Sequence, residues 1–362
     1  MCKERKYPLI TLAKPTSIGY LWTKQFQPSY SIHVILVTGG TGFLGSTLIK
    51  FLIDEGHAVL AIKREQSEIP EILRSSSLVE WLPADITDYF ALAEAFKGVT
   101  QVYHCAAKIS YQKADWASML HTNIEGTKHI VNLCLEQGIR LVHVSSIAAL
   151  GSPKAGELIS EESKWDDGAD HAKYALSKYE SELEVWRGIM EGLDAVIINP
   201  SVIMGVGPGK KASEAIFNLV QNGIKIYPPG TVGIVDVEDV VKIMVLLMES
   251  PDISGERFVL NSENLSNQEL LGRIAKLLDK PAPTIKATPF MLSIAWRAAK
   301  IIALLTGKRP TLTRENAKAS ASRLAYSNKK ITDTTGYCFK PVDVTLKEMS
   351  INFKNLNPIS NS

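Results

Sequence analysis

The sequence has few cysteines and lacks the histidine patterns of a metal site. Its 362 residues include four cysteines, Cys2, Cys105, Cys134 and Cys338, which are far apart and form no CxxC motif. This usage argues against a disulfide scaffold and favours buried thiols in a reducing compartment. The seven histidines include no HExxH or other ligand spacing, so no metal site is predicted.

A large excess of one charge and a long apolar run are also missing. The chain has 40 Lys and Arg against 38 Asp and Glu, a formal charge of +2, which gives no electrostatic reason to expect a nucleic-acid partner. Its longest apolar stretch, Phe290–Leu305, is interrupted by Arg297 and Lys300. Because that stretch is shorter than the roughly 20 residues of a membrane span, no transmembrane helix is predicted.

Residues 1–33 do not resemble a secretory signal. They contain no continuous apolar stretch and are interrupted by Pro8, Pro15 and Pro28, so we expect a cytoplasmic protein. A strand-like run then begins abruptly at Val34. We hypothesise that Val34 occupies the position of the natural initiator and that residues 1–33 are a disordered extension.

From Val34 onward, short β-branched runs alternate with amphipathic stretches. This alternation predicts an α/β fold with a parallel, doubly wound sheet and right-handed crossovers. The expected strands are Val34–Thr38, Ala58–Ile62, Leu78–Leu82, Gln101–His104, Leu141–Ser145 and Ala195–Asn199, and the expected helices are Gly42–Glu55, Thr87–Phe96, Trp116–Gln137 and Ala172–Met190. After Gly205 the alternation loosens and helical patterns dominate.

A glycine-rich loop joins the first expected strand to the first expected helix. Gly39 suits a tight turn, Gly42 lets the backbone approach a pyrophosphate, and Gly45 allows close packing of helix and strand. The candidate contacts of this loop with a dinucleotide are Thr38, Gly39, Gly42, Phe43, Leu44 and Gly45. We therefore assign residues 34–204 to a Rossmann-type NAD(P)-binding domain. Residues 205–353 form a smaller, mostly helical substrate-binding region interleaved with it, and residues 354–362 form a tail.

The residues after the second strand bear on cofactor choice. NAD-selective sites place an acidic residue there, whereas basic residues suit a 2′-phosphate. This chain has Lys63 and Arg64, which favours NADP(H) and leaves NAD(H) open. Further cofactor contacts are expected at the ends of the third and fourth strands, from Asp85 and Ile86 and from Ala106 and Ala107.

The segment Tyr174-Ala175-Leu176-Ser177-Lys178 carries the predicted chemistry. Positions four apart share one face of a helix, so Tyr174 and Lys178 are expected to reach the same cleft. A nearby ammonium, with the positive nicotinamide of an oxidised cofactor, favours the phenolate and is expected to lower the tyrosine pKa from its usual value of about 10 toward neutrality. Ser146, after the fifth strand, is placed to hydrogen-bond a substrate oxygen near that phenol.

With these motifs in the correct chain order, residues from Val34 to Phe353 resemble the extended short-chain dehydrogenase/reductases, the NAD-dependent epimerase/dehydratase family. The resemblance is greatest to the branch of dihydroflavonol reductases and 3β-hydroxysteroid dehydrogenases. It implies that Ser146, Tyr174 and Lys178 form a catalytic triad, with both Tyr174 and Lys178 near the cofactor, and that Asn123 supports a proton relay to the lysine. It also implies a structural role for Asp239.

The same resemblance places Pro200 and Val202 beside the nicotinamide ring. It further implies a homodimer whose interface is a four-helix bundle made by Trp116–Gln137 and Ala172–Met190 of each copy.

The reaction class depends on the substrate side. Ile147 and Ala148 follow Ser146 where dehydratases of this family carry Asp-Glu, and the stretch from Thr231 to Ile234 lacks the arginine with which epimerases hold a diphosphate. The favoured interpretation is therefore hydride transfer between NADP(H) and an apolar ketone/alcohol pair. A nucleotide-sugar epimerase with tightly held NAD, and a non-catalytic dinucleotide sensor, are the alternatives.

The pocket for that small molecule is expected to include Ile109, Ser110, Tyr111 and Ser146, with residues around Phe290. Two interpretations of the stretch 290–305 remain open. In the favoured one, it is a helix that buries its apolar face over the substrate site. In the other, it is an interfacial helix in contact with a membrane surface.

Overall fold

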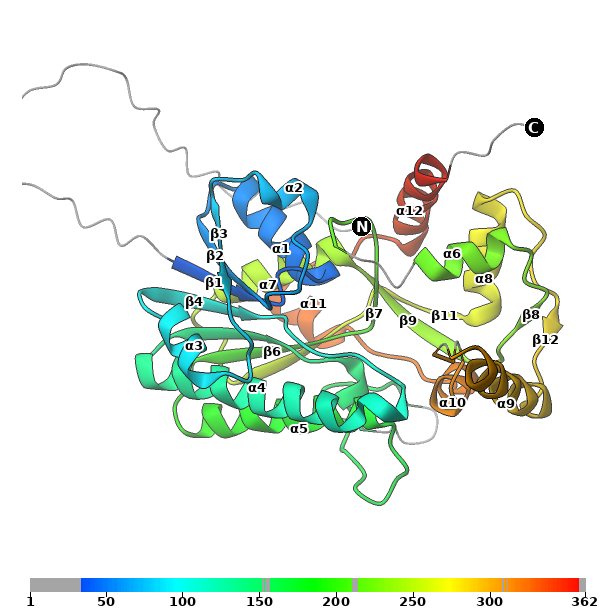
Figure 1. Ribbon diagram of the computed structural model, residues 1–362, viewed down its shortest axis with the longest axis horizontal. Helices are drawn as coiled ribbons and strands as arrows, with labels where there is room; N and C mark the ends of the chain where they lie inside the picture. Colours follow the sequence, from blue (N-terminus) through cyan, green and yellow to red (C-terminus); the bar gives the residue numbers. More distant parts are fainter. Residues whose placement is uncertain are drawn as a thin grey trace, which may run out of the picture.

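The computed structural model describes residues 34–357, apart from residues 152, 154–156, 210–213, 308 and 311. The hypotheses about residues 1–33 therefore lie outside the described residues. At its centre seven parallel strands lie in the order β10-β6-β5-β4-β1-β2-β3 (Figure 1). Their bounds are β1 Val34–Thr38, β2 Val59–Lys63, β3 Val79–Pro83, β4 Val99–His104, β5 Arg140–Val144, β6 Ala195–Pro200 and β10 Glu256–Leu260.

Helices cover both faces of this sheet (Figure 1). One face carries α1 (Phe43–Asp54), α2 (Glu71–Arg74), α7 (Val237–Met248) and α11 (Lys329–Thr335), and the other carries α3 (Tyr89–Ala95), α4 (Trp116–Gln137) and α5 (Lys173–Met190). Alternate residues of β1 enter the two cores, Ile35 and Val37 on one side and Leu36 on the other. This is the period-two burial expected of a strand that is covered on both faces.

The predicted doubly wound fold is thus confirmed, and the order β3-β2-β1-β4-β5-β6 is that of a dinucleotide-binding sheet. Val34–Thr38 and Trp116–Gln137 are predicted to the residue. Most other ends differ by one or two residues; for example, β4 begins at Val99 rather than Gln101. Such shifts are usual at element ends, where local patterns fade.

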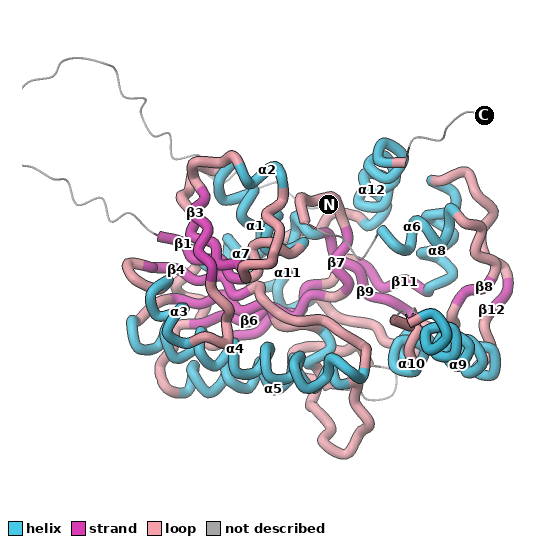
Figure 2. Tube along the Cα trace, in the orientation of Figure 1, coloured by secondary structure: helices cyan, strands magenta, loops and turns pink. Residues whose placement is uncertain are grey.

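The second half of the chain is mostly helical, as predicted, and it also contains several short strands. It contains a three-stranded sheet of β7 (Val202–Met204), β9 (Thr231–Asp236) and β11 (Glu263–Ser266), and a pair of strands, β8 (Ile226–Tyr227) and β12 (Ile285–Lys286) (Figure 2). Around them lie α6 (Glu214–Gln221), α8 (Asn267–Leu277), α9 (Pro289–Thr306), α10 (Arg314–Ala321) and α12 (Val342–Leu356). The expected tail is shorter, because α12 continues to Leu356.

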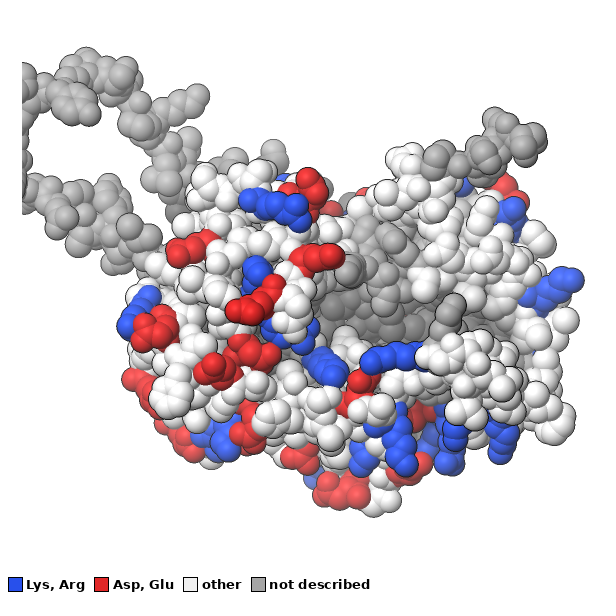
Figure 3. All heavy atoms as spheres, in the orientation of Figure 1, with Lys and Arg blue, Asp and Glu red and all other residues white. Residues whose placement is uncertain are grey.

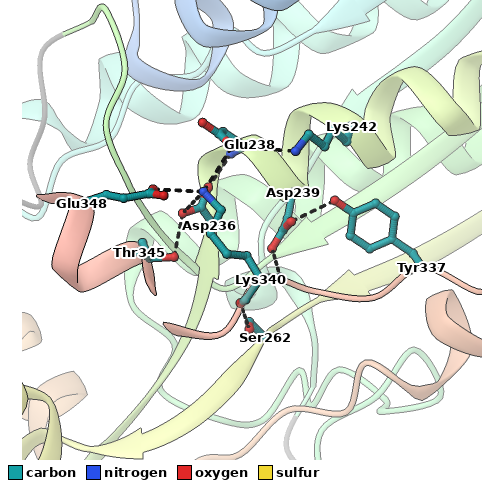
Figure 4. Close-up of polar contacts among 9 residues, drawn as sticks. All are labelled: Asp236, Glu238, Asp239, Lys242, Ser262, Tyr337, Lys340, Thr345 and Glu348. Atoms are coloured by element: carbon teal, nitrogen blue, oxygen red, sulfur yellow. Dashed lines mark hydrogen bonds and ion pairs between the residues drawn. The ribbon is translucent and has the colours of Figure 1, made fainter. Parts of the chain in front are cut away.

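A buried polar cluster ties the start of α7 to the last part of the chain (Figure 4). Asp239 accepts hydrogen bonds from the Tyr337 hydroxyl and the Lys340 amide, both at 2.8 Å. Asp236 caps α7 and accepts a 2.6 Å bond from the Thr345 hydroxyl. Burial raises the pKa of Asp239. These contacts support the structural role expected of Asp239, since they join the start of α7 to the segment that leads into α12.

Candidate active site

The glycine loop lies where β1 ends, and two of its glycines are required by close contacts. Gly39 has a φ of 69°, and a Cβ there would lie 2.7 Å from the Ala106 amide nitrogen after β4. A Cβ on Gly45 would collide with the Gly39 carbonyl. Thr38 fixes the same junction, because its hydroxyl lies 2.7 Å from His104 Nδ1 and accepts a 3.1 Å bond from the Ala106 amide.

Helix α1 begins directly after this loop and presents its first turn to the edge of the sheet. Gly42 is its N-cap and supplies no side-chain acceptor, and the first turn, from Phe43 and Leu44 onward, holds no acidic residue. The amide groups there can therefore bind an anion, with the positive end of the helix dipole behind them. The geometry fits the pyrophosphate of a dinucleotide.

A second glycine-rich segment, Gly205–Gly209 after β7, lies against this loop and was not singled out from the sequence. A Cβ on Gly209 would lie 2.7 Å from the Gly42 carbonyl carbon, and one on Gly207 would meet Phe43. The signal was present as Gly-Val-Gly-Pro-Gly, but nothing in the sequence indicated that β7 would return the chain to α1.

The residues predicted to contact the adenosine half of the cofactor lie at the same edge of the sheet. They differ in whether their side chains are exposed, hydrogen-bonded or buried. Arg64 is exposed, and Lys63 Nζ lies 3.4 Å from the Glu65 carbonyl. Asp85 Oδ1 is engaged with the Thr87 amide and hydroxyl at 3.0 and 2.8 Å. The Ile86 side chain is buried among the residues of the core. The cofactor roles of these residues stay predictions.

Ser146 follows β5 and Tyr174 lies in the first turn of α5, and their joint catalytic role stays a prediction. Ser146 accepts a 3.1 Å bond from the Ala148 amide, which holds its hydroxyl at the start of a short 3-10 turn, Ile147–Ala149. The Ser146 hydroxyl lies close enough to Tyr174 to act on the pKa of its phenol. Serine and tyrosine hydroxyls therefore share one position at the carboxyl edge of the sheet.

The expected lowering of the Tyr174 pKa is wrong for the chain itself. Burial raises the pKa of Tyr174 to about 12, Tyr111 raises it further, and the hydrogen bond from Ser146 opposes this shift. Desolvation therefore outweighs the favourable contact. At neutral pH the Tyr174 side chain is a phenol that can donate a proton.

Lys178 lies one helical turn beyond Tyr174 and is buried. Its ammonium donates a 2.8 Å hydrogen bond to the Val144 carbonyl at the end of β5. Burial lowers the pKa of Lys178 to about 8, while Glu182 and Cys105 act to raise it. The Lys178 ammonium therefore lies at the end of β5, and it loses its charge as the pH rises through about 8.

Asn123 of α4 is buried, and both the oxygen and the nitrogen of its side-chain amide form hydrogen bonds. Its oxygen accepts a 2.7 Å bond from the Lys108 amide, and its nitrogen donates to the Lys108 carbonyl and the Ser177 hydroxyl, both at 3.0 Å. These bonds fix the segment after β4 to α4 and α5. The relay to Lys178 that the resemblance implied stays a prediction, since the hydrogen bonds of Asn123 go to the neighbouring residue, Ser177.

Glu182 lies one helical turn beyond Lys178 and is buried. It was not identified from the sequence. Its carboxylate accepts bonds from Ser145 (2.6 Å) and Asn199 (2.8 Å) and pairs with Arg257 (2.9 Å). Asn199 also donates to the Ser146 carbonyl at 3.0 Å. The four-residue spacing from Lys178 was the available signal, but an acid at that spacing is equally typical of a solvated helix face.

On the substrate side, Tyr111 lies next to Tyr174, with ring centroids 5.8 Å apart. Ile109 is exposed, whereas Ser110 is buried and donates to Asp115. Glu315 of α10 has a buried oxygen without a hydrogen-bond partner among the described residues, and it acts to raise the pKa of Tyr111. Sequence patterns did not identify it, because nothing local indicates that α10 faces Tyr111.

The remaining predicted residues have mixed placements. Ala106 packs against Gly39 and Ala107 is exposed beside it. Pro200 is buried at the end of β6, and Val202 is exposed at the start of β7. The expectation that the stretch 290–305 buries its apolar face is wrong: Phe290 is 73% exposed, and Ala303 is the only buried residue of α9.

Together, the doubly wound sheet and the glycine loop at the start of α1 define a dinucleotide-binding fold, and Ser146, Tyr174 and Lys178 lie at the carboxyl edge of its sheet. The model of the NAD dependent epimerase/dehydratase family matches residues 35–261. The chain belongs to this family, and it is an NAD(P)-dependent reductase within it.

Named relatives agree with this class. A Synechocystis sp. protein named a dihydroflavonol 4-reductase is 29% identical over 83% of this chain and 88% of its own length. Sterol demethylase protein B of Methylococcus capsulatus is 30% identical over 71% and 78%. Cinnamoyl-CoA reductase 1 of Petunia hybrida is 28% identical over 71% and 81%.

Solved structures share the fold. The crystal structure of gox2253 superposes with a TM-score of 0.76 at 28% identity, covering 90% of this chain and 98% of the other. The Bordetella bronchiseptica enzyme WbmG, solved with NAD and UDP, has a TM-score of 0.70 at 19% identity over 89% and 94%.

Proposed function

We propose that this chain reduces the carbonyl group of an apolar small molecule with NADPH, or oxidises the corresponding alcohol with NADP. The observation that carries the proposal is the placement of Ser146, Tyr174 and Lys178 at the carboxyl edge of the sheet, near the glycine loop. The bound dinucleotide supplies or accepts the hydride. A relative named as a dihydroflavonol 4-reductase supports a substrate of this general kind.

The protein side chains then have separable roles. In the reducing direction the Tyr174 phenol donates its proton to the substrate oxygen, and the raised pKa of Tyr174 keeps that proton in place at neutral pH. Ser146 orients the same oxygen by a hydrogen bond. Lys178 supplies a positive charge near the phenol and the cofactor ribose, and Tyr111 and Glu315 border the substrate.

NADP(H) is the proposed cofactor form because Lys63 and Arg64 follow β2, with Glu65 the first acid. A guanidinium can bind a 2′-phosphate with two parallel hydrogen bonds. A homodimer through α4 and α5 is proposed on the resemblance, with cytoplasmic location, and light scattering of the purified chain would test the dimer.

Replacing Tyr174 by Phe tests the catalytic assignment. NADPH oxidation with a panel of apolar ketones, from cyclohexanone to acetophenone, is expected to fall about 100-fold or more, the effect of losing a general acid. NADPH affinity is expected to survive. Tyr179→Phe is the matched control, because Tyr179 lies on the same helix and stacks on Trp165 through its ring. Unchanged turnover in Tyr174→Phe would remove Tyr174 from this role and favour the non-catalytic sensor.

A further inference from the structure

The exposed apolar face of α9 is the feature that the proposed function leaves unexplained. The helix runs from Pro289 to Thr306, with Thr288 as N-cap and Gly307 as C-cap. Among the described residues it is long and apolar enough to cross a membrane by length and composition, and Ala303 is its only buried residue. A soluble core helix would bury its apolar residues, so α9 is a surface helix with an unpartnered apolar side.

The exposed residues form one continuous face. At 100° per residue, Phe290, Ile294, Ile301 and Leu305 fall along one side of the helix, and they are 73%, 51%, 58% and 80% exposed. The opposite side carries Ala303, the one buried residue of α9, and α9 packs there against α10. The exposed side is therefore available to a partner.

The charge around α9 indicates what kind of partner fits. Between Lys286 and Arg323 the sequence holds eight Lys and Arg residues and one acidic residue, Glu315, whereas the whole chain has a formal charge of only +2. Arg297 and Lys300 lie along one edge of the apolar face, and the Arg297 guanidinium lies 4.6 Å from the centre of the Trp296 ring. Figure 3 has the orientation of Figure 1, in which α9 lies at the lower right. There the surface is mainly white, with basic side chains along its lower border.

We propose that α9 lies in the surface of an anionic lipid bilayer, with its apolar side among the acyl chains and its basic edge at the headgroups. Interfacial helices combine these two features, and long basic side chains reach back to the headgroups. A membrane-spanning orientation fits less well, because 18 residues of helix are about 27 Å long and would place two cations in mid-bilayer. A second copy fits less well too, since it would bring two basic surfaces together.

Vesicle flotation of the purified full chain tests this docking. The chain is expected to float with vesicles of phosphatidylcholine and phosphatidylglycerol, to float far less with phosphatidylcholine alone, and to be released by high salt. Ile301→Glu with Leu305→Glu should lose at least about tenfold in vesicle affinity. Arg297→Gln with Lys300→Gln should weaken binding to the anionic vesicles about fivefold for each charge removed.

Phe90→Glu is the matched control, since Phe90 is 83% exposed on α3, remote from α9. It is expected to float like the parent chain, and circular dichroism should show that all variants are folded. The proposal is overturned if the parent chain does not float with anionic vesicles, or if Ile301→Glu with Leu305→Glu floats equally well. An oligomer that this double variant abolishes, without vesicle binding, would assign α9 to a second copy. None of these readouts depends on enzymatic activity.

Discussion

At the scale of single residues, burial controls the chemistry of the candidate site. Tyr174 and Lys178 lie one turn apart on α5, yet desolvation moves their pKa values in opposite directions, to about 12 and about 8. Both shifts favour the uncharged form of the side chain. The tyrosine is thus prepared to give a proton, and the lysine holds its charge only up to mildly basic pH.

The pH dependence of cofactor affinity follows from the Lys178 pKa. Because this pKa is about 8 in the folded chain, the ammonium is present below that pH and lost above it. NADPH affinity is expected to weaken as the pH rises through about 8, as followed by nucleotide fluorescence. In Lys178→Met this dependence should disappear. An affinity that is flat across this range in the parent chain would contradict the role of Lys178 at the cofactor.

Cofactor choice is predicted to depend on Arg64 and Lys63. Replacing both by Ala should weaken NADPH binding about tenfold or more, the cost of losing charged contacts to a phosphate, and leave NADH binding nearly unchanged. Lys97→Ala is the control, since Lys97 is an exposed residue paired with Glu94. Equal losses for the two nucleotides would show that these residues do not read the 2′-phosphate.

The sequence identified the residues whose spacing is local and missed those assembled by the fold. Tyr174 and Lys178 share a helix face, and Ser146 follows a recognisable strand, so their meeting could be predicted. Glu182 and Glu315 depend on contacts with Arg257 and Tyr111 from distant elements. The direction of the Tyr174 shift was also missed, because desolvation depends on what covers the ring.

At the scale of elements, one buried carboxylate holds β5, β6, β10 and α5 in place. Glu182 is 2% exposed and binds Ser145 directly after β5, Asn199 of β6 and Arg257 of β10. A buried ion pair is costly to break, because the remaining partner is left uncompensated. The position of Ser146 relative to Tyr174 therefore depends on this network as well as on the main chain.

Glu182→Ala is predicted to lower the free energy of unfolding by about 3–5 kcal/mol, since it leaves Arg257 unpaired in the protein. Urea unfolding followed by circular dichroism measures this. Glu184→Ala, on the same helix, removes a surface pair with Arg187 and should cost no more than about 1 kcal/mol. Similar losses in the two variants would contradict a special role for Glu182.

Whether an element was predictable depended on how much of its pattern is local. The first six strands read correctly because turns and amphipathic helices separate them. β10 was missed because its apolar part is only Phe258-Val259-Leu260, a run too short to distinguish from loop or helix. Its parallel pairing with β6 joins segments that are far apart in the sequence, so no local pattern predicts it.

At the scale of the whole molecule, the two halves are interleaved. α7, β10 and α11 come from the second half of the sequence and complete the first core, while the cluster around Asp236 and Lys340 links α7 to the C-terminal helix. Net charge was a poor guide at this scale, because a whole-chain balance near zero conceals the basic segment around α9.

The central claim is that the chain exchanges NADP(H) with solution in order to reduce a carbonyl group. The most direct test is to denature the purified protein and to identify and count the nucleotide released. An epimerase regenerates its cofactor in each cycle and can retain it, whereas a reductase must release it after each turnover. The account predicts far less than one nucleotide per chain. Near-stoichiometric NAD would contradict both the proposed cofactor and the proposed reaction.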